Sequence, residues 1–105
     1  ILAVDLSLSS LAYAQRKTAE LGFDNLRYMQ ADILQLDGLE TQFDIIESVG
    51  VLHHMKNPME GWQKLTYCLR PNGLMKIGLY SKLARQGIIK IREVIIFFYL
   101  ILTQF

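Results

Sequence analysis

The sequence predicts an α/β fold in which a mostly parallel sheet carries helices on both faces. Three observations predict it. Short apolar runs of strand length recur along the chain, segments with helical spacing separate them, and polar residues follow the carboxyl ends of several runs. Strands that alternate with helices form a parallel sheet, because right-handed crossovers bring each new strand back in the same direction.

The first third of the chain is predicted to form a strand, a helix and a strand. Residues 1–4 are a continuous apolar run, which is typical of a strand covered on both faces. Ser7 is placed to cap a helix that ends at Gly22, where glycine permits the left-handed stop. Residues 26–30 are predicted to form the second strand, and Asp32 follows it closely.

The middle of the chain repeats this pattern. A polar loop around Gly38 precedes an apolar strand that begins with residues 43–46. Asn57 is placed to cap the next helix, and Pro58 suits its first position. One face of that helix is predicted to lie in the core, and it consists of Met59, Trp62, Leu65 and Leu69.

The segment after this helix is predicted to turn and then extend. Residues 70–73 (RPNG) have the composition of a turn, with a positive φ expected at Gly73. Residues 74–80 are predicted to form the next strand, and a helix is expected from Leu83 onward.

The composition of the 105 residues is that of one globular domain or a piece of one, with 51% hydrophobic and 20% charged residues. A net charge of +1 with scattered basic residues gives no field for nucleic acid, so no nucleic-acid partner is expected. The single Cys68 cannot form an internal disulfide, and with only two histidines no structural zinc site is expected. These features favour a reducing compartment, so we expect a cytoplasmic protein.

Both ends of the chain are unusual. It starts at Ile1 instead of Met and enters a strand at once, so we expect that the biological N-terminus is missing. Residues 94–102 (VIIFFYLIL) are nine consecutive apolar residues. A membrane span needs about 20, so this run predicts a buried or interfacial helix and no transmembrane segment.

Polar residues follow three of the predicted strands. Asp5, Asp32 and the pair Glu47 and Ser48 each stand at or near the carboxyl end of a strand. In a parallel sheet these ends line one edge, so the residues are predicted to converge there. A carboxylate after one strand can accept hydrogen bonds from both hydroxyls of a ribose, and one after the next strand can accept from an adenine amino group.

Four segments in this order resemble the class I S-adenosylmethionine-dependent methyltransferases. They are DLS, the AD that follows a strand, FDIIESVGVLHHM and LRPNGLMKIGLYS. The amino-acid sequences of the last two segments are most similar to those of methyltransferase domains that accompany tetratricopeptide repeats. Such repeats are therefore expected in a longer protein. The resemblance covers residues 1–85 of a partial methyltransferase domain spanning 1–105, with 86–105 as an apolar helical tail. It implies a partial Rossmann-like fold and S-adenosyl-L-methionine as the cofactor.

The resemblance also implies roles for individual residues. Asp5, with its neighbour Leu6, matches the acidic position that binds the cofactor ribose, and Ser48 matches the strand end beside the methionine part. The turn that binds adenine is matched by Ala31, Asp32 and Ile33. His53 and His54 fall in the loop that borders the substrate pocket, and His53 is the candidate catalytic residue. The implied reaction is methyl transfer to an unidentified acceptor, with no metal.

One departure from the family pattern bears on activity. The glycine-rich turn after the family's first strand is absent, because the chain begins at what would be the second strand. The family strand order is 3-2-1-4-5, so the central strand is missing, and the final antiparallel strands are missing as well. Only glycine lets a backbone approach the cofactor that closely. We therefore expect that these 105 residues alone do not methylate.

Other interpretations of the same residues remain open. Asp5 can instead cap the following helix, Asp32 can be a plain turn residue, and His53 can position its loop. An acidic residue after the second strand also suits the ribose of NAD, so a dinucleotide-binding oxidoreductase is an alternative function. A third is a non-catalytic interaction module whose apolar tail docks on a partner.

Overall fold

The computed structural model of the chain describes residues 1–81, 86–88 and 90–91. The apolar run at 94–102 lies outside the described residues, and so does most of the helix expected from Leu83. Residues 86–88 and 90–91 are helical, in agreement with that expectation.

The first part of the chain forms β1 (Leu2–Asp5), α1 (Leu8–Glu20) and β2 (Arg27–Gln30), as predicted. The two strands pair in parallel, with Leu2 opposite Arg27 and Asp5 opposite Gln30. The α1 helix begins where the Ser7 hydroxyl accepts a hydrogen bond from the Ser10 amide at 3.2 Å. It ends before Gly22, whose φ of 75° is the left-handed conformation expected there.

The second part contains β3 (Phe43–Val49), α2 (Pro58–Tyr67) and β4 (Leu69–Gly78), with two 3₁₀ helices between them. These are η1 (Ile33–Gly38) and η2 (Leu52–His54). Strands β3 and β4 pair in parallel. Sequence patterns predicted a polar loop where η1 lies, because a single 3₁₀ segment has no periodicity that distinguishes it from a loop.

The RPNG segment corrects one prediction. It lies inside β4, which begins at Leu69, and it is not a turn before the strand. Phe43 pairs with Leu69, whereas Ile45 pairs with Leu74, so the register jumps across this segment. Asn72 has the positive φ, of 65°, in place of Gly73. A Cβ on Gly73 would come within 2.9 Å of the Asp44 carbonyl oxygen, so this glycine serves close backbone approach.

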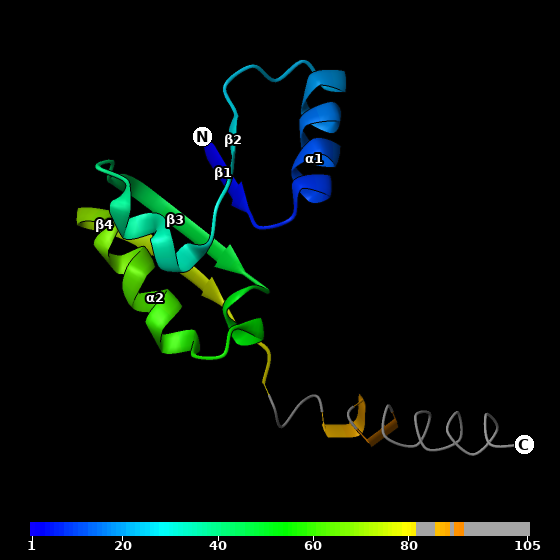
Figure 1. Ribbon diagram of the computed structural model, residues 1–105, viewed down its shortest axis with the longest axis vertical. Coiled ribbons are helices and arrows are strands. Elements are labelled where there is room, and N and C mark those ends of the chain that lie inside the picture. Colours follow the sequence, from blue (N-terminus) through cyan, green and yellow to red (C-terminus); the bar gives the residue numbers. More distant parts are fainter. Residues whose placement is uncertain (82–85, 89, 92–105) are drawn as a thin grey trace, which may run out of the picture.

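Helices cover both faces of the strands, which confirms the predicted α/β class. Val4 and Met29 face the apolar core, and Tyr28 points the other way, where its hydroxyl contacts Thr18 of α1. Figure 1 shows α1 and α2 on opposite sides of the strands. The strands form two separate pairs, β1–β2 and β3–β4, and no hydrogen bonds join β1 to β3.

One apolar cluster joins the two strand pairs. Its buried members are Leu36, Leu52, Leu65 and Cys68, and Leu52 has no exposed surface. Half-buried side chains from both pairs pack against it, including Val4 and Met29 from the first pair and Ile46, Met75 and Ile77 from the second. Burial around η1, η2 and α2 therefore substitutes for strand pairing between the halves.

The apolar face predicted for α2 is wrong in part. Leu65 is buried, but Met59 is 66% and Trp62 37% exposed. The helix instead presents Gly61 and Leu65 to η1 and η2, since Gly61 lets Leu52 and Met55 approach closely. Asn57 occupies the cap position without a side-chain capping bond.

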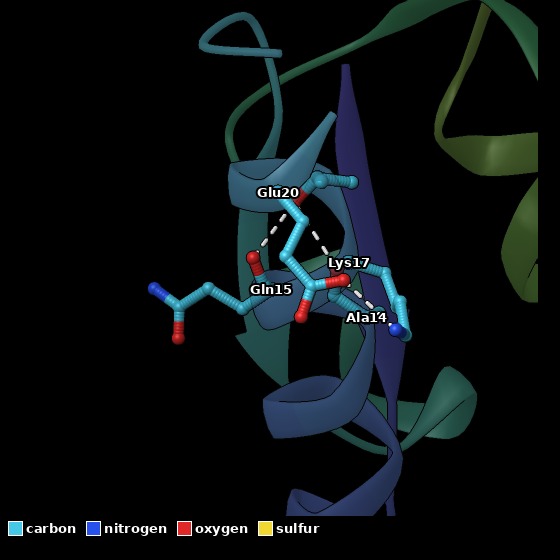
Figure 2. A network of polar contacts seen from close by, with 5 residues as sticks. Ala14, Gln15, Lys17 and Glu20 are labelled. Atoms are coloured by element: carbon cyan, nitrogen blue, oxygen red, sulfur yellow. Dashed lines mark hydrogen bonds and ion pairs between the residues drawn. The ribbon is translucent and has the colours of Figure 1, made fainter. Parts of the chain in front are cut away.

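The α1 surface carries local polar contacts within the helix. Lys17 and Glu20 form an ion pair of 2.8 Å, and the Ala14 and Gln15 carbonyls accept from the Thr18 hydroxyl (Figure 2). Such an exposed pair contributes little to stability.

Asp37 of η1 and Lys64 of α2 form an ion pair that links two layers far apart in sequence. The hydrogen bond from Lys64 lowers the pKa of Asp37 below its ordinary 3.8. The same bond raises the pKa of Lys64 above its ordinary 10.5. The ion pair therefore stabilises the fold fully between the two ordinary pKa values, 3.8 and 10.5. Its contribution decreases as the pH falls below the first value or rises above the second.

We predict that Asp37→Asn destabilises the chain at neutral pH and has a vanishing effect in acid. The pKa of Asp37 is lowered on folding, so its contribution is present above 3.8 and disappears as the pH falls through the folded value. Urea unfolding followed by circular dichroism between neutral and acid pH would measure this. Asp44→Asn is the control, because Asp44 pairs with Arg70 where both side chains are more than half exposed. A difference between the two variants that is the same at every pH would contradict the assignment.

Candidate functional site

The carboxyl ends of β1 and β2 meet at one corner of the molecule. The Ala31 amide donates to the Asp5 carbonyl at 3.2 Å, which ties the ends of the strands together. The Gln30 side chain donates to the Leu6 carbonyl at 3.0 Å and so holds the loop between β1 and α1. Gln30 was not among the predicted site residues, although a polar residue at the end of a strand is a signal for such a role.

The Asp5 side chain is held by a local hydrogen bond, although Ser7, and not Asp5, is the N-cap of α1. Its Oδ1 accepts from the Ser7 amide at 2.7 Å, so it orders the turn that leads into α1. Its side chain is exposed, and Oδ2 makes no hydrogen bond within the described part of the chain. One oxygen fixes the orientation of the carboxylate, and the other points to where a ligand could reach it.

Asp32 repeats this arrangement at the end of β2. It is the N-cap of η1, and its Oδ1 accepts from the Leu34 amide at 2.9 Å. The carboxylate is half-buried, and its Oδ2 has no partner among the described residues. Its neighbours Ala31 and Ile33 pack against the apolar cluster, which leaves Asp32 as the polar member of this turn.

A groove of about 670 Å³ lies between β1 and β3. Val4 lines it on one side and Ile46 and Ser48 on the other. Its floor includes Ile33, Leu36, Leu65 and Cys68. The groove separates the Asp5 and Asp32 corner from the strand that carries Ser48.

Ser48 is the one buried polar residue in the described part of the chain, and it is 8% exposed. Its hydroxyl makes no hydrogen bond to any described group. Neighbouring Glu47 points to the opposite face, where it forms an ion pair with Lys76 at 2.9 Å. A buried hydroxyl without a partner costs stability, so Ser48 is the side chain in the groove that a polar ligand would satisfy.

His53 lies beyond the groove, in η2. Its ring is half-buried between His54, with centroids 4.0 Å apart, and Tyr80, at 4.1 Å. Three rings from η2 and the residues after β4 thus form one cluster, which restricts the orientation of the His53 imidazole. His53 therefore lies on a different element from Asp5, which ends β1, and from Asp32, which caps η1.

Cys68 lines the groove but is not a reactive thiol. Burial raises its pKa, and the charge of Asp37 raises it further. The thiol also donates to the Leu36 carbonyl at 3.4 Å. A raised pKa keeps the group as a neutral thiol, which is a poor nucleophile. Within the described residues, no cluster of three metal-ligating side chains forms.

A family model for a methyltransferase domain matches residues 1–77, which include β1 to β3 and most of β4. The chain belongs to this family. The matched residues include three of the four segments that carried the resemblance, and the fourth as far as Ile77. The positions of Asp5, Asp32 and Ser48 lie within the match. The association with tetratricopeptide repeats is not part of this match.

Two individual proteins are similar to this chain. The uncharacterized protein syc1184_c of Synechococcus sp. is 34% identical over 96 residues, which are 90% of this chain and 23% of that protein. The crystal structure of the YcgJ protein from Bacillus subtilis superposes with a TM-score of 0.68 over 76% of this chain and 35% of that one, at 22% identity. This chain therefore shares its fold with YcgJ. It spans about a quarter of the length of syc1184_c.

The helices in the described part of the chain lack the length and apolar character that crossing a membrane requires.

We predict that Ser48→Ala stabilises the chain by about 1 kcal/mol, because it removes a buried hydroxyl without a hydrogen-bond partner. Ser10→Ala, on the exposed surface of α1, is the control and should change stability only through helix propensity, by about 0.5 kcal/mol or less. Urea unfolding midpoints would measure both. A loss of stability in Ser48→Ala would show that the hydroxyl has a partner in the folded chain.

Proposed function

We propose that this methyltransferase domain uses S-adenosyl-L-methionine and transfers its methyl group to a nucleophilic acceptor. The observation that carries the proposal is the matched pair of carboxylates, Asp5 and Asp32. Each is oriented by one backbone amide, and each keeps a second oxygen without a partner in the described chain. Family membership favours this function over a nicotinamide-dependent oxidoreductase.

The donor and acceptor groups that are present fit this cofactor. Asp5 would accept from the ribose hydroxyls, and Asp32, between Ala31 and Ile33, would accept from the adenine amino group. Leu6 follows Asp5 in an exposed loop and would contact the sugar through its apolar side chain. Ser48, across the groove, would satisfy its hydroxyl on the polar methionine part. The carboxylates and the hydroxyl thus provide polar contacts at both ends of an apolar groove.

The chain contributes mainly alignment. When bound, the cofactor supplies an electrophilic methyl group, which the acceptor takes by direct displacement as S-adenosylhomocysteine leaves. Oriented carboxylates reduce the freedom of the bound nucleoside before reaction. His53 is the candidate base, because an imidazole nitrogen can take the proton of the acceptor, and tilted ring contacts with His54 and Tyr80 hold its ring.

Two properties of a longer protein also belong to this proposal. The resemblance of residues 69–81 (LRPNGLMKIGLYS) to methyltransferase domains that accompany tetratricopeptide repeats supports such a repeat region outside this chain. A single, buried, unreactive cysteine supports a cytoplasmic protein, because cysteines stay reduced there.

We predict that Asp5→Asn and Asp32→Asn each weaken S-adenosylmethionine binding about tenfold. Asparagine keeps the oxygen that accepts from the backbone amide, so the turn survives while the second oxygen becomes a donor. Titration calorimetry on the 105-residue chain would measure binding, and sustained methyl transfer by this chain alone is not expected. Asp44→Asn, at the amino end of β3, is the matched control and should bind as the unmodified chain does.

Two outcomes would contradict this assignment. Equal affinity in all three variants would show that neither carboxylate contacts the cofactor. Binding of NAD in preference to S-adenosylmethionine would return the function to the dinucleotide-binding alternative.

A further inference from the structure

We propose that Tyr80 is a positioning residue that covers the His53 imidazole, so that an acceptor reaches this group only by displacing the Tyr80 ring. The proposal rests on the proposed function, in which His53 is the candidate base. It adds a residue that follows β4 to the acceptor side of the site, and it favours acceptors that are flat.

The ring nitrogens of His53 are not accessible in this conformation. Nδ1 and Nε2 each expose less than 1 Å² of surface, although the side chain as a whole is half-buried. A general base has to come within hydrogen-bond distance of the proton that it takes, either directly or through one water. His53 can therefore act as a base only after a neighbouring group has moved.

The two rings that contact His53 differ in how their backbones are held. His54 belongs to η2, where its amide donates to the Val51 carbonyl at 3.0 Å, and Leu52 of the same turn is completely buried. Tyr80 follows β4 by two residues, in a stretch without regular secondary structure, and its side chain is 54% exposed. Movement of Tyr80 breaks no strand or helix, whereas movement of the His54 backbone would disrupt η2. The movement is therefore assigned to Tyr80.

The Tyr80 side chain also reaches the end of β3. A Cβ on Gly50, which directly follows β3, would lie 3.9 Å from the Tyr80 hydroxyl. The Gly50 amide donates to the Gly78 carbonyl at 3.1 Å, which brings the ends of β3 and β4 together there. Ser48 is two residues before Gly50 in the sequence. An acceptor in the place of the Tyr80 ring would thus lie beside the strand end where the proposed function places the methionine part of the cofactor.

The contact that an acceptor has to replace indicates its shape. His53 packs against two rings, with centroids 4.0 and 4.1 Å from its own. An aromatic acceptor restores the contact that is lost when Tyr80 moves, whereas a puckered aliphatic ring of similar size restores it poorly. The acceptor class that fits is therefore an aromatic ring that carries a hydroxyl group.

The transfer to such an acceptor needs one proton to be removed. The phenolic hydroxyl would give its proton to His53, and its oxygen would form the new bond to the methyl carbon. The electrons of the broken carbon–sulfur bond would remain on the sulfur of S-adenosylhomocysteine.

The chain contains two histidines, so the accessibility of each can be followed separately. Diethyl pyrocarbonate acylates imidazole nitrogens that solvent reaches, and tandem mass spectrometry of the 105-residue chain would give the rate at each residue. His53 should react more slowly than His54, whose side chain is exposed. We expect Tyr80→Ala to speed the reaction of His53 about tenfold, because the ring contact is lost.

Matched variants separate the ring from other effects of this substitution. Tyr80→Phe keeps the ring and removes only the hydroxyl, so it should restore the slow reaction of His53. Tyr67→Ala removes a tyrosine of similar exposure, 61%, from the end of α2 and should leave the rate unchanged. The Met55 amide, which donates to the Leu52 carbonyl, reports by hydrogen exchange whether η2 remains folded in each variant.

The Tyr80→Ala variant also tests the shape of the acceptor. Phenol should slow the reaction of His53 relative to that of His54 in this variant, because it occupies the place of the lost ring. Cyclohexanol at the same concentration should slow it less. These experiments contain no cofactor, so their results are independent of whether Asp5 and Asp32 bind S-adenosylmethionine.

Each other outcome decides against the proposal. Equal rates at the two histidines of the unmodified chain, or an unchanged His53 rate in Tyr80→Ala, would show that Tyr80 does not cover His53. A rise that Tyr67→Ala reproduces, or one accompanied by loss of Met55 protection, would overturn the proposal too. Equal effects of phenol and cyclohexanol would exclude selection for a flat acceptor. If the expected results hold but S-adenosylmethionine does not bind, the proposed function fails and the cover over His53 remains.

Discussion

The apolar cluster around Leu52 is the contact on which the rest of the structure depends. The two pairs of strands share no hydrogen bonds, so nothing in the sheet fixes one pair relative to the other. Leu36, Leu65 and Cys68 surround Leu52, and Val4 and Met29 from the first pair pack on this cluster. Packing is not directional, but close-packed side chains of fixed shape define a relative position. The cluster therefore sets the separation of the corner that carries Asp5 and Asp32 from Ser48.

Apolar packing buries carbon atoms, whereas strand pairing satisfies backbone hydrogen bonds. At the groove the first requirement is met and the second is not. The cluster buries carbon atoms beneath the gap between β1 and β3, while the backbone edges above it stay unpaired. Polar backbone groups remain exposed to water only as long as the gap stays open.

Local sequence signals predicted what depends on near neighbours. The Ser7 cap, the Gly22 stop and the convergence of Asp5 with the Asp32 turn follow from hydrogen bonds within a few residues or from parallel strand direction. Local signals gave wrong predictions where contacts with residues distant in the sequence determine the structure. Met59 and Trp62 share a helical face with Leu65, yet η1 and η2 contact only the side that carries Gly61 and Leu65. The RPNG segment lies inside β4 because its pairing with β3 shifts register, which turn propensity cannot show.

The choice between structural and ligand-binding roles for the two aspartates is not exclusive. In each residue Oδ1 is fixed by a backbone amide, at 2.7 Å from Ser7 for Asp5 and 2.9 Å from Leu34 for Asp32. A carboxylate held by one oxygen has less rotational freedom, so its other oxygen would bind a ligand at a smaller entropic cost. Ser48 differs, because burial holds its hydroxyl in place without any partner in the described chain. Each carboxylate thus has a partner within the described chain, whereas the Ser48 hydroxyl would gain one only from a ligand.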